Sequence, residues 1–199
     1  MKAALLPDRG VVKVAGPDAR TFLNGLLTAD IALMTPATPR YAALLTPQGK
    51  IIVDSLVVQA PVEDGGDFFL DCPRALATNL VERLNFYKLR AKVIVEDLSE
   101  TLGVMALWGG AGSSGFGQCY ADPRLPALGS RCMLGVHLAD KAAAAFGATL
   151  AGAADYDAHR IALGVPRGGF DFIYGDAFPH EADMDQLGGV DFDKGCFVG

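Results

Sequence analysis

Short apolar runs separated by turn residues fill the first part of the chain. Residues 10–14 read as a strand, and a Gly-Pro-Asp triplet then begins a helix whose apolar residues recur at helical spacing as far as residue 27. Two β-rich runs follow, at residues 41–46 and 51–58, on either side of a Pro-Gln-Gly turn. Apolar strands around such a turn predict a β-hairpin.

The middle of the chain alternates strands with one clear helix. Residues 67–71 form a short predicted strand, Pro73 opens a helix that keeps its apolar spacing through Tyr87, and residues 92–97 return to a strand. A strand, a helix and a strand in this order, beside hairpins, favour an α+β fold with ferredoxin-like layers over a doubly wound sheet.

The last part of the chain is less regular. Residues 103–108 and 131–138 are predicted strands, and residues 139–146 and 155–163 are predicted helices. The stretch 167–190 is irregular and rich in glycine, acidic and aromatic residues. A loop of this length in a compact domain is usually functional or wraps another domain.

Composition and charge narrow the class of protein. Of 199 residues, 51% are hydrophobic and 20% are charged, which indicates a globular chain. The formal net charge of −6 argues against extended nucleic-acid binding, which needs a basic face. No apolar run approaches the roughly 18 residues that span a bilayer, and the apolar N-terminus is too short for a signal peptide. We therefore expect a cytoplasmic protein without membrane contact and, for lack of a long amphipathic stripe, a monomer.

The cysteine spacing and the glycine-rich run give little support for a metal or nucleotide cofactor. The four cysteines, Cys72, Cys119, Cys132 and Cys196, form no CxxC or CxxH pair, so we expect no metal site and, in a reducing compartment, no disulfide framework. The run from residue 109 to 117 fits GxGxxG at Gly110, Gly112 and Gly115, but the residues after it are not helical. A dinucleotide site requires a helix there, so we favour a hairpin loop.

Three positions are candidates for chemistry on local grounds. Cys196 follows Lys194 by two residues, and an ammonium directed at the thiol would favour the thiolate, although a lone cysteine more often packs in a core. Asp54 interrupts an apolar strand, where it either faces solvent or points into a ligand cavity. Arg160 lies on a predicted helix, and it becomes a site residue if it and Asp54 face one cavity.

Five segments in chain order resemble one family. Residues 16–30 fit G-x-D-A-x-x-F-L-x-G-x-x-T-x-D, residues 44–54 contain L-x-P-Q-G-K-x-x-x-D, and residues 87–93 fit Y-x-L-R-x-K-V. Residues 160–166 fit R-I-x-x-G-x-P, and residues 179–199 end in the pattern K-G-C-[YF]-x-G. Together they cover nearly the whole chain. It resembles the YgfZ-type folate-binding proteins, the iron–sulfur maturation branch of the aminomethyltransferase (glycine-cleavage T-protein) superfamily.

The resemblance implies an architecture. It predicts a cloverleaf of α+β domains around a central channel for tetrahydrofolate or a derivative. Residues 1–46 together with about 140–199 would form a first, discontinuous folate-binding domain, and residues 47–139 a second α+β domain. In the family the signature continues with Gln-Glu and a C-terminal β-barrel domain, whereas this sequence stops at Gly199, so we expect the chain to lack that domain.

The resemblance also implies a site and a function. Asp54 takes the position of the transferase branch's catalytic carboxylate, where it would hold a ring or amine nitrogen by a charge-assisted hydrogen bond. Lys194 and Cys196 take the signature positions, and with Arg160 they complete the expected catalytic and folate-binding set.

The implied role is a tetrahydrofolate-binding accessory protein for iron–sulfur cluster assembly or repair, with iron–sulfur enzymes or assembly factors as partners. An aminomethyltransferase of glycine cleavage, favoured by Asp54, is the alternative. A scaffold in which Cys196 merely packs is a third hypothesis, and whether the protein catalyses a reaction stays open.

Overall fold

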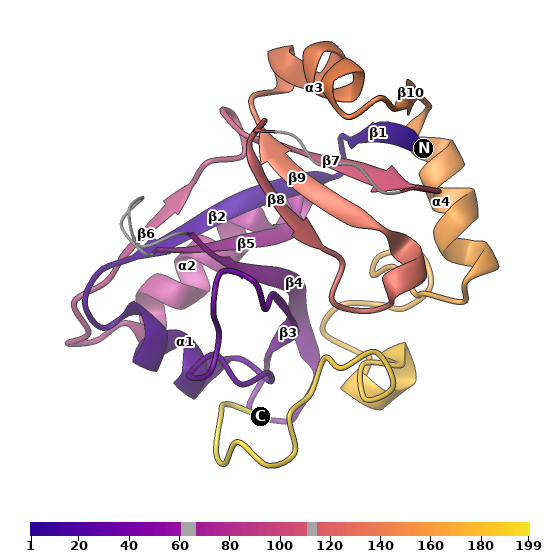
Figure 1. Cartoon of the computed structure of the whole chain (residues 1–199). Coiled ribbons are helices and arrows are strands. Elements are labelled where there is room, and N and C mark those ends of the chain that lie inside the picture. Colours follow the sequence, from indigo (N-terminus) through magenta and orange to yellow (C-terminus); the bar gives the residue numbers. More distant parts are fainter. Residues whose placement is uncertain (61–66, 111–114) are drawn as a thin grey trace.

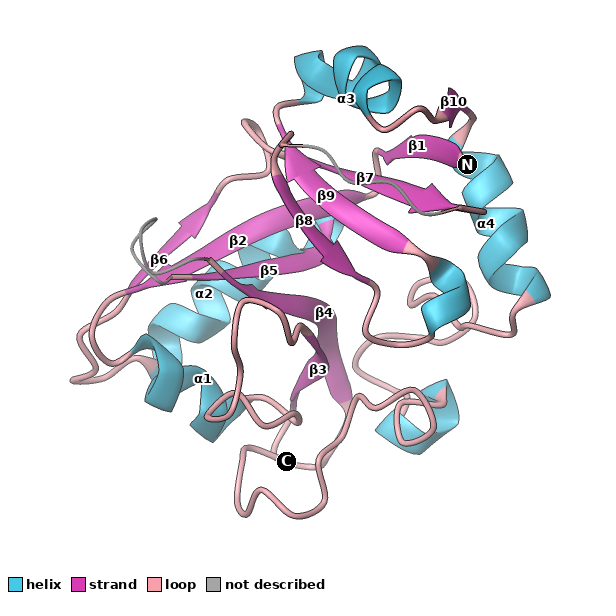
Figure 2. Ribbon diagram, in the orientation of Figure 1, coloured by secondary structure: helices cyan, strands magenta, loops and turns pink. Residues whose placement is uncertain are grey.

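The computed structural model describes residues 1–60, 67–110 and 115–199. The strands in these residues form two five-stranded sheets (Figure 1, Figure 2). The first sheet has the order β10 (Thr149–Leu150), β1 (Lys2–Leu6), β7 (Gly103–Trp108), β9 (Ser130–Leu134), β8 (Gln118–Ala121). The second sheet has the order β3 (Arg40–Leu45), β4 (Ile51–Gln59), β5 (Phe68–Pro73), β2 (Arg9–Ala15), β6 (Ile94–Asp97). Strands β1 and β10 run parallel, and the other neighbours run antiparallel.

Four α-helices lie in the described residues: α1 (Ala19–Leu26), α2 (Ala77–Tyr87), α3 (Ala139–Ala145) and α4 (Ala153–Ala162). Helices α1 and α2 pack on one face of the second sheet, α3 covers one face of the first sheet, and α4 lies beside β1 (Figure 1). Short 3-10 turns occur at Arg74–Leu76, Pro126–Leu128, Val136–Leu138 and Pro179–Ala182. None of the helices in the described ranges has the length and apolar character needed to span a bilayer.

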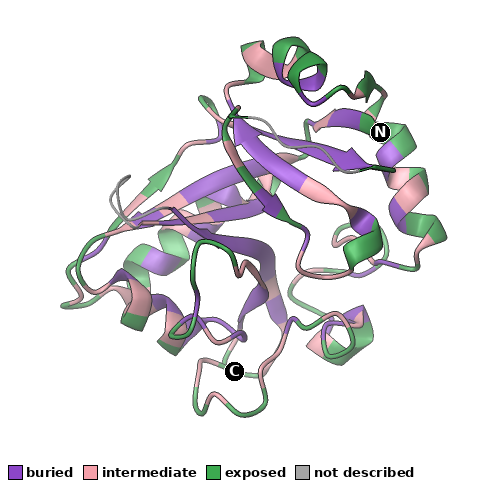
Figure 3. Ribbon diagram, in the orientation of Figure 1, coloured by how far each residue is buried: buried purple, intermediate pink, exposed green. Residues whose placement is uncertain are grey.

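The strand period explains this layering. Successive side chains of a strand point to opposite faces of its sheet. In β2, Val11 packs between the two sheets, whereas Val12 and Val14 pack beneath α1 and α2. In β7, Val104 faces the second sheet and Met105 faces α3. Both sheets are therefore buried on two faces, and the buried strands cross the centre of the molecule (Figure 3).

The α+β prediction is confirmed, and so is the hairpin, which is β3 and β4. The strand predicted at residues 131–138 is wrong in its second half, where the chain forms the short turn Val136–Leu138. Strands β1, β8 and β10 were not predicted. The irregular stretch after residue 167 is confirmed, and it lies along β4, where Gly175 and Ala177 bond to the backbone of Ile51.

The glycine-rich run leads into β8 and not into a helix. Part of it, including Gly112, lies outside the described residues. The prediction of a hairpin loop fails in one respect. A hairpin joins neighbouring strands, whereas β9 lies between β7 and β8 in the sheet. The dinucleotide reading lacks the helix that it requires.

One expectation about the cysteines is wrong. Cys119 and Cys132 form a disulfide between β8 and β9, while Cys72 and Cys196 are free thiols. The two sulfurs meet because the strands bring residues 13 positions apart in sequence into direct register. The spacing of cysteines in the sequence does not show such a pair.

The expected domain boundaries stay a prediction. The strands of the second sheet all lie between residues 9 and 97, and those of the first sheet lie at residues 2–6 and 103–150. The boundary expected at residue 46 falls in the turn between β3 and β4, which pair in the same sheet. Strand pairing thus groups the chain differently from the division into residues 1–46 with 140–199 and residues 47–139.

Candidate functional site

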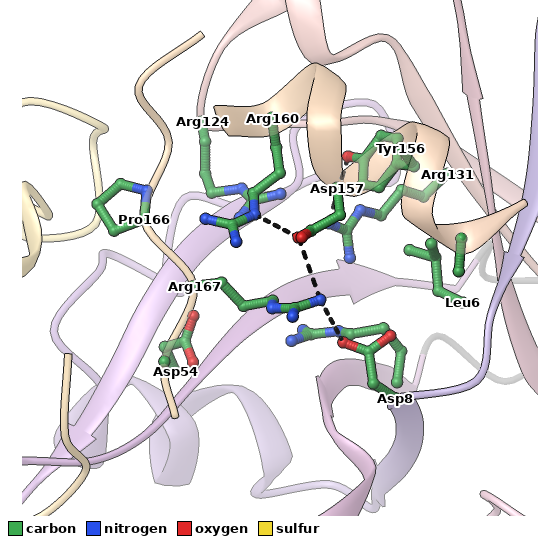
Figure 4. Close-up of a pocket in the computed structure, with 13 residues that line it drawn as sticks. Leu6, Asp8, Asp54, Arg124, Arg131, Tyr156, Asp157, Arg160, Pro166 and Arg167 are labelled. Atoms are coloured by element: carbon green, nitrogen blue, oxygen red, sulfur yellow. Dashed lines mark hydrogen bonds and ion pairs between the residues drawn. The ribbon is translucent and has the colours of Figure 1, made fainter. Parts of the chain in front are cut away.

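A pocket opens where β2 and β4 of the second sheet meet α4 and the segment that follows it (Figure 4). We call it the arginine pocket, after five of its lining residues: Arg9, Arg124, Arg131, Arg160 and Arg167. Its free volume is about 50 Å³. This is far below the roughly 300–1,000 Å³ of ordinary small-molecule sites.

Asp71 of β5 binds two of these arginines at the back of the pocket. Its carboxylate is fully buried and accepts hydrogen bonds from Arg9 Nε at 2.6 Å, Arg131 Nη1 at 2.7 Å and the Tyr120 hydroxyl at 2.8 Å. Burial alone would raise the pKa of Asp71, but Arg9 and Arg131 outweigh it and lower the pKa below its ordinary value. Asp71 is therefore ionised and paired with both arginines.

Asp122 binds the third arginine. Its buried carboxylate accepts two hydrogen bonds from Arg124, at 2.9 and 2.7 Å, and lies 3.2 Å from Nε of Arg131. Burial alone would raise the pKa of Asp122, yet Arg124 and then Arg131 lower it to about 2. The two buried carboxylates thus hold Arg124 and Arg131 in fixed positions on the pocket wall.

The last two arginines are also paired. Arg160 binds Asp157 at 2.7 Å, the carbonyl of Val165 at 3.1 Å, and the carboxylate of Asp171. Arg167 lies 3.2 Å from Asp157 and 3.5 Å from Asp8 (Figure 4). Because every arginine of the pocket has a carboxylate partner, the pocket is not an open anion site.

Asp54 differs from the other carboxylates of the pocket. It is buried on β4, lines the pocket together with Arg160, and forms no direct ion pair in the described residues, although it lies close enough for its charge to act on Arg9. Its bonds come from two phenols, Tyr41 at 3.2 Å and Tyr174. Burial and then the charge of Asp54 raise the pKa of both tyrosines, which keeps them protonated as donors. Asp54 is therefore a buried acceptor for a ligand N–H or a ligand cation.

Tyr41 separates the arginine pocket from a larger space. Its hydroxyl binds Asp54, and its side chain also lines a second pocket of about 450 Å³, which we call the wide pocket. That volume lies within the roughly 300–1,000 Å³ of ordinary small-molecule sites. The walls of the wide pocket include Arg40, Asp30 and the segment Asp191–Asp193, which directly precedes Lys194. Tyr41 therefore links Asp54, through its hydroxyl, to a pocket whose lining includes the residues just before the terminal signature.

Lys194 lies at the end of α1, outside both pockets. Its ammonium donates to the carbonyl oxygens of Asn24 at 2.7 Å, Leu27 at 2.6 Å and Ala29 at 2.8 Å. A helix leaves its last carbonyls without partners, and a cation there complements the helix dipole. Partial burial lowers the pKa of Lys194, and this effect exceeds the rise that the negative charges of Asp30 and Asp191 would cause.

The structure separates the expected site residues into two groups. Asp54 and Arg160 both line the arginine pocket. Arg160 was expected to be a site residue if it and Asp54 faced one cavity, and they do. Lys194 and Cys196 lie at the far end of the terminal segment, and Cys196 is exposed. The three donors of the Lys194 ammonium are all bound to carbonyls, so none is directed at the thiol.

Sequence reasoning missed most of the residues around Asp54, namely Arg9, Tyr41, Asp71, Tyr120, Asp122, Arg124, Arg131 and Tyr174. One signal was available for Asp71 and Arg131. Each is a charged residue within an apolar strand, which is the feature that singled out Asp54. No group of three metal-ligating side chains occurs in the ranges that the structure describes.

Comparison with known protein families identifies the chain. The family model described as the GCVT N-terminal domain matches residues 8–116, which is more than half of the sequence. The chain belongs to the GCVT N-terminal domain family. The match covers the whole second sheet and β7, and so includes Asp54 and the buried Asp71.

Curated relatives of this GCVT-family chain are named as iron–sulfur cluster assembly factors. It is 35% identical over 211 residues to the "Iron-sulfur cluster assembly factor IBA57 homolog, mitochondrial" of Mycosarcoma maydis, covering 100% of this chain and 52% of the relative. It is 32% identical over 217 residues to the human "Iron-sulfur cluster assembly factor IBA57, mitochondrial", covering 98% of this chain and 59% of the relative. The chain thus spans about half the length of these relatives.

The fold also matches a solved structure. The glycine cleavage system aminomethyltransferase T from Bartonella henselae superposes with a TM-score of 0.73 at 20% identity, over 89% of this chain and 55% of that one. The likeness confirms the expected aminomethyltransferase-like fold. The curated relatives contradict the prediction of a cytoplasmic location, because both of those described above are named mitochondrial.

Proposed function

We propose that this GCVT-family chain is the folate-binding part of an iron–sulfur cluster assembly or repair factor of the YgfZ and IBA57 type. Three observations support the proposal. The relatives named above are iron–sulfur assembly factors. The sequence has the Lys-Gly-Cys signature at Lys194–Cys196. The observation that carries the ligand is Asp54, a buried carboxylate whose hydrogen bonds within the described residues come from two phenols.

The chemistry of the site fits a reduced pterin. The ring of tetrahydrofolate carries N–H groups, and a buried carboxylate binds such donors by charge-assisted hydrogen bonds. The arginine pocket has too little free volume for the ring, whereas the wide pocket has room for it. We propose that the ligand occupies the wide pocket and that its N–H reaches Asp54 when the Tyr41 side chain, which bonds Asp54 and belongs to the lining of that pocket, turns aside.

A calorimetric titration with tetrahydrofolate tests the ligand. We expect saturable binding, and we expect Asp54→Asn to weaken it roughly tenfold to a hundredfold, the loss that corresponds to one hydrogen bond to a charged group. Asp8→Asn is the matched control, because Asp8 lines the same pocket but is paired with Arg167. Absence of saturable binding by the native chain would refute the folate assignment.

A cellular assay tests the iron–sulfur role separately. In cells that lack the chromosomal copy, the native protein should restore the activity of an iron–sulfur enzyme, and Cys196→Ala should restore less. If Cys196→Ala and Lys194→Ala each restore the enzyme activity as fully as the native protein does, the scaffold hypothesis is favoured. The partners, iron–sulfur enzymes or assembly factors, and the monomeric state stay proposals, which affinity capture and light scattering test.

Asp54 also keeps the aminomethyltransferase alternative open. The fold matches a glycine-cleavage transferase, and the resemblance places Asp54 at the catalytic carboxylate. An assay for methylene-tetrahydrofolate formed from an aminomethylated lipoyl carrier decides. Turnover that Asp54→Asn abolishes would favour the transferase over the accessory protein.

A further inference from the structure

The disulfide between β8 and β9 joins an exposed residue to a buried one. Cys119 and Cys132 stand directly opposite each other in the antiparallel pair. Cys119 is exposed, whereas Cys132 is fully buried beneath α3. A small thiol or disulfide in solution therefore meets the sulfur of Cys119 first.

The strand that carries Cys119 has few other attachments. Strand β8 has four residues, lies at the edge of the first sheet, and among the described strands pairs with β9 alone (Figure 1). A short edge strand opens more readily than a central strand, because it has hydrogen bonds on one side only. The bond from Cys119 to Cys132 thus adds a covalent link to an edge ladder of only four residue pairs.

The next rung of the same ladder belongs to the buried charge cluster. Tyr120 and Arg131 are register partners, and both donate to the same carboxylate oxygen of Asp71. Side chains alternate across a strand, so the cysteines face α3 while Tyr120 and Arg131 face the second sheet. Loosening β8 from β9 would displace the Tyr120 hydroxyl from Asp71, behind the arginine pocket.

We propose that Cys119 and Cys132 form a reversible thiol–disulfide exchange site that locks or releases the β8–β9 pair. The oxidant is a low-molecular-weight disulfide such as oxidised glutathione. The Cys119 thiolate attacks it, forms a mixed disulfide and expels one glutathione thiolate, which takes up a proton. Cys132 then gives up its proton and attacks the Cys119 sulfur, which forms the protein disulfide and expels the second glutathione. The pair loses two electrons and two protons, and the glutathione disulfide gains them.

The surroundings suit both states of the pair. In the reduced state the Phe116 carbonyl, 3.2 Å from the Cys119 sulfur, would accept its S–H. The other cysteines are different in kind. Cys72 is buried on β5, where burial raises its thiol pKa to about 12, and Cys196 lies far along the chain in the terminal segment. Disulfides in reducing compartments are commonly transient or redox-sensing, which agrees with an exchange site.

Glutathione buffers test the proposal on the intact chain. After equilibration at a series of reduced-to-oxidised ratios, alkylation and mass spectrometry should show Cys119 and Cys132 converting together between two thiols and one disulfide. Hydrogen exchange should then show the amides of β8 opening on the order of a hundredfold less often in the oxidised protein, as expected for a loop of this size.

Variants serve as controls. Cys132→Ala should leave Cys119 as a stable glutathione adduct, because the resolving thiol is missing, and Cys196→Ser should leave the conversion unchanged. Circular dichroism checks that each variant is folded. A pair that stays reduced in fully oxidised glutathione, or stays oxidised in fully reduced glutathione, overturns the exchange site. If the two cysteines convert between thiols and disulfide but the hydrogen exchange of the β8 amides does not change, the disulfide does not lock the β8–β9 pair. Neither result depends on folate binding, so failure here is distinct from failure of the proposed function.

Discussion

Replacing Lys194 with methionine tests what the signature lysine does. Methionine keeps most of the apolar stem and removes the ammonium, so the carbonyls of Asn24, Leu27 and Ala29 lose their shared donor. Other links hold the terminal segment near the end of α1: the Thr28 hydroxyl donates to the carbonyl of Gly189, the amide of Asp191 donates to the carbonyl of Thr28, and Val198 packs against the apolar cluster under α1. The segment should stay attached, but less firmly.

The magnitude follows from the exposure of the ammonium. A hydrogen bond to a charged group contributes roughly 1.5–3 kcal/mol when buried, so three such bonds would add up to a large figure. Lys194 is only half-buried, however, and water satisfies both the ammonium and the freed carbonyls in the variant. We therefore expect the free energy of unfolding to fall by about 1–2 kcal/mol, as for a partly exposed interaction at a helix end.

The assay distinguishes an anchor from a thiol activator. An anchor predicts a lower midpoint in chemical denaturation and an alkylation rate of Cys196 that is unchanged or faster, since the segment moves more freely. An activator predicts slower alkylation and a pH–rate profile shifted to higher pH, because the thiolate loses a nearby cation. Lys194→Arg, which keeps the charge but not the compact ammonium, should recover part of the stability.

A single result would refute the anchoring role. If Lys194→Met leaves the denaturation midpoint unchanged and slows the alkylation of Cys196, the three carbonyl bonds do not hold the segment. The lysine would then act on the thiol, as local sequence reasoning first suggested.

Two further predictions concern stability. Asp122→Asn should flatten the acid side of the stability curve. The pKa of Asp122 in the folded protein is about 2, and its ordinary value is 3.8, so the pairing of Asp122 stabilises the native protein by about 2 kcal/mol above about pH 5. The native protein loses this stabilisation as pH falls from about 4 towards 2. Equal slopes of stability against pH for the native and variant proteins in acid denaturation would contradict the prediction. Leu23→Ala, on the buried face of α1, should cost about 2–5 kcal/mol, whereas Leu33→Ala, at a side chain that is 74% exposed, should change stability by less than about 0.5 kcal/mol in the same urea titration.

The elements with strong local patterns were predictable. The β3–β4 hairpin has apolar strands around a Pro-Gln-Gly turn, and α2 has a regular apolar spacing, so local rules give the right structure. Strands β1 and β8 escaped prediction for opposite reasons. The first is buried among strands from distant parts of the chain, and the second is a short edge strand beside glycine. Neither has an alternation long enough to separate it from a loop.

The candidate site was half predictable. Asp54 could be singled out because a carboxylate in an apolar strand must have a reason to be there, and Arg160 because the family pattern includes it. Their partners could not be found in this way. Tyr174 lies 120 positions from Asp54, and Tyr120 lies 49 positions from Asp71, so no local pattern relates them.

The sequence by itself determined the superfamily and the main strands and helices, and it singled out Asp54, Arg160, Lys194 and Cys196 as candidates, since these depend on side-chain type and short-range pattern. Only the tertiary structure decided what those residues touch. It bound the ammonium of Lys194 to the end of α1, left Asp54 without a cation among paired arginines, and joined Cys119 to Cys132. The physical reason is that burial, charge pairing and strand register depend on which distant segments meet, and that is settled only when the two sheets pack.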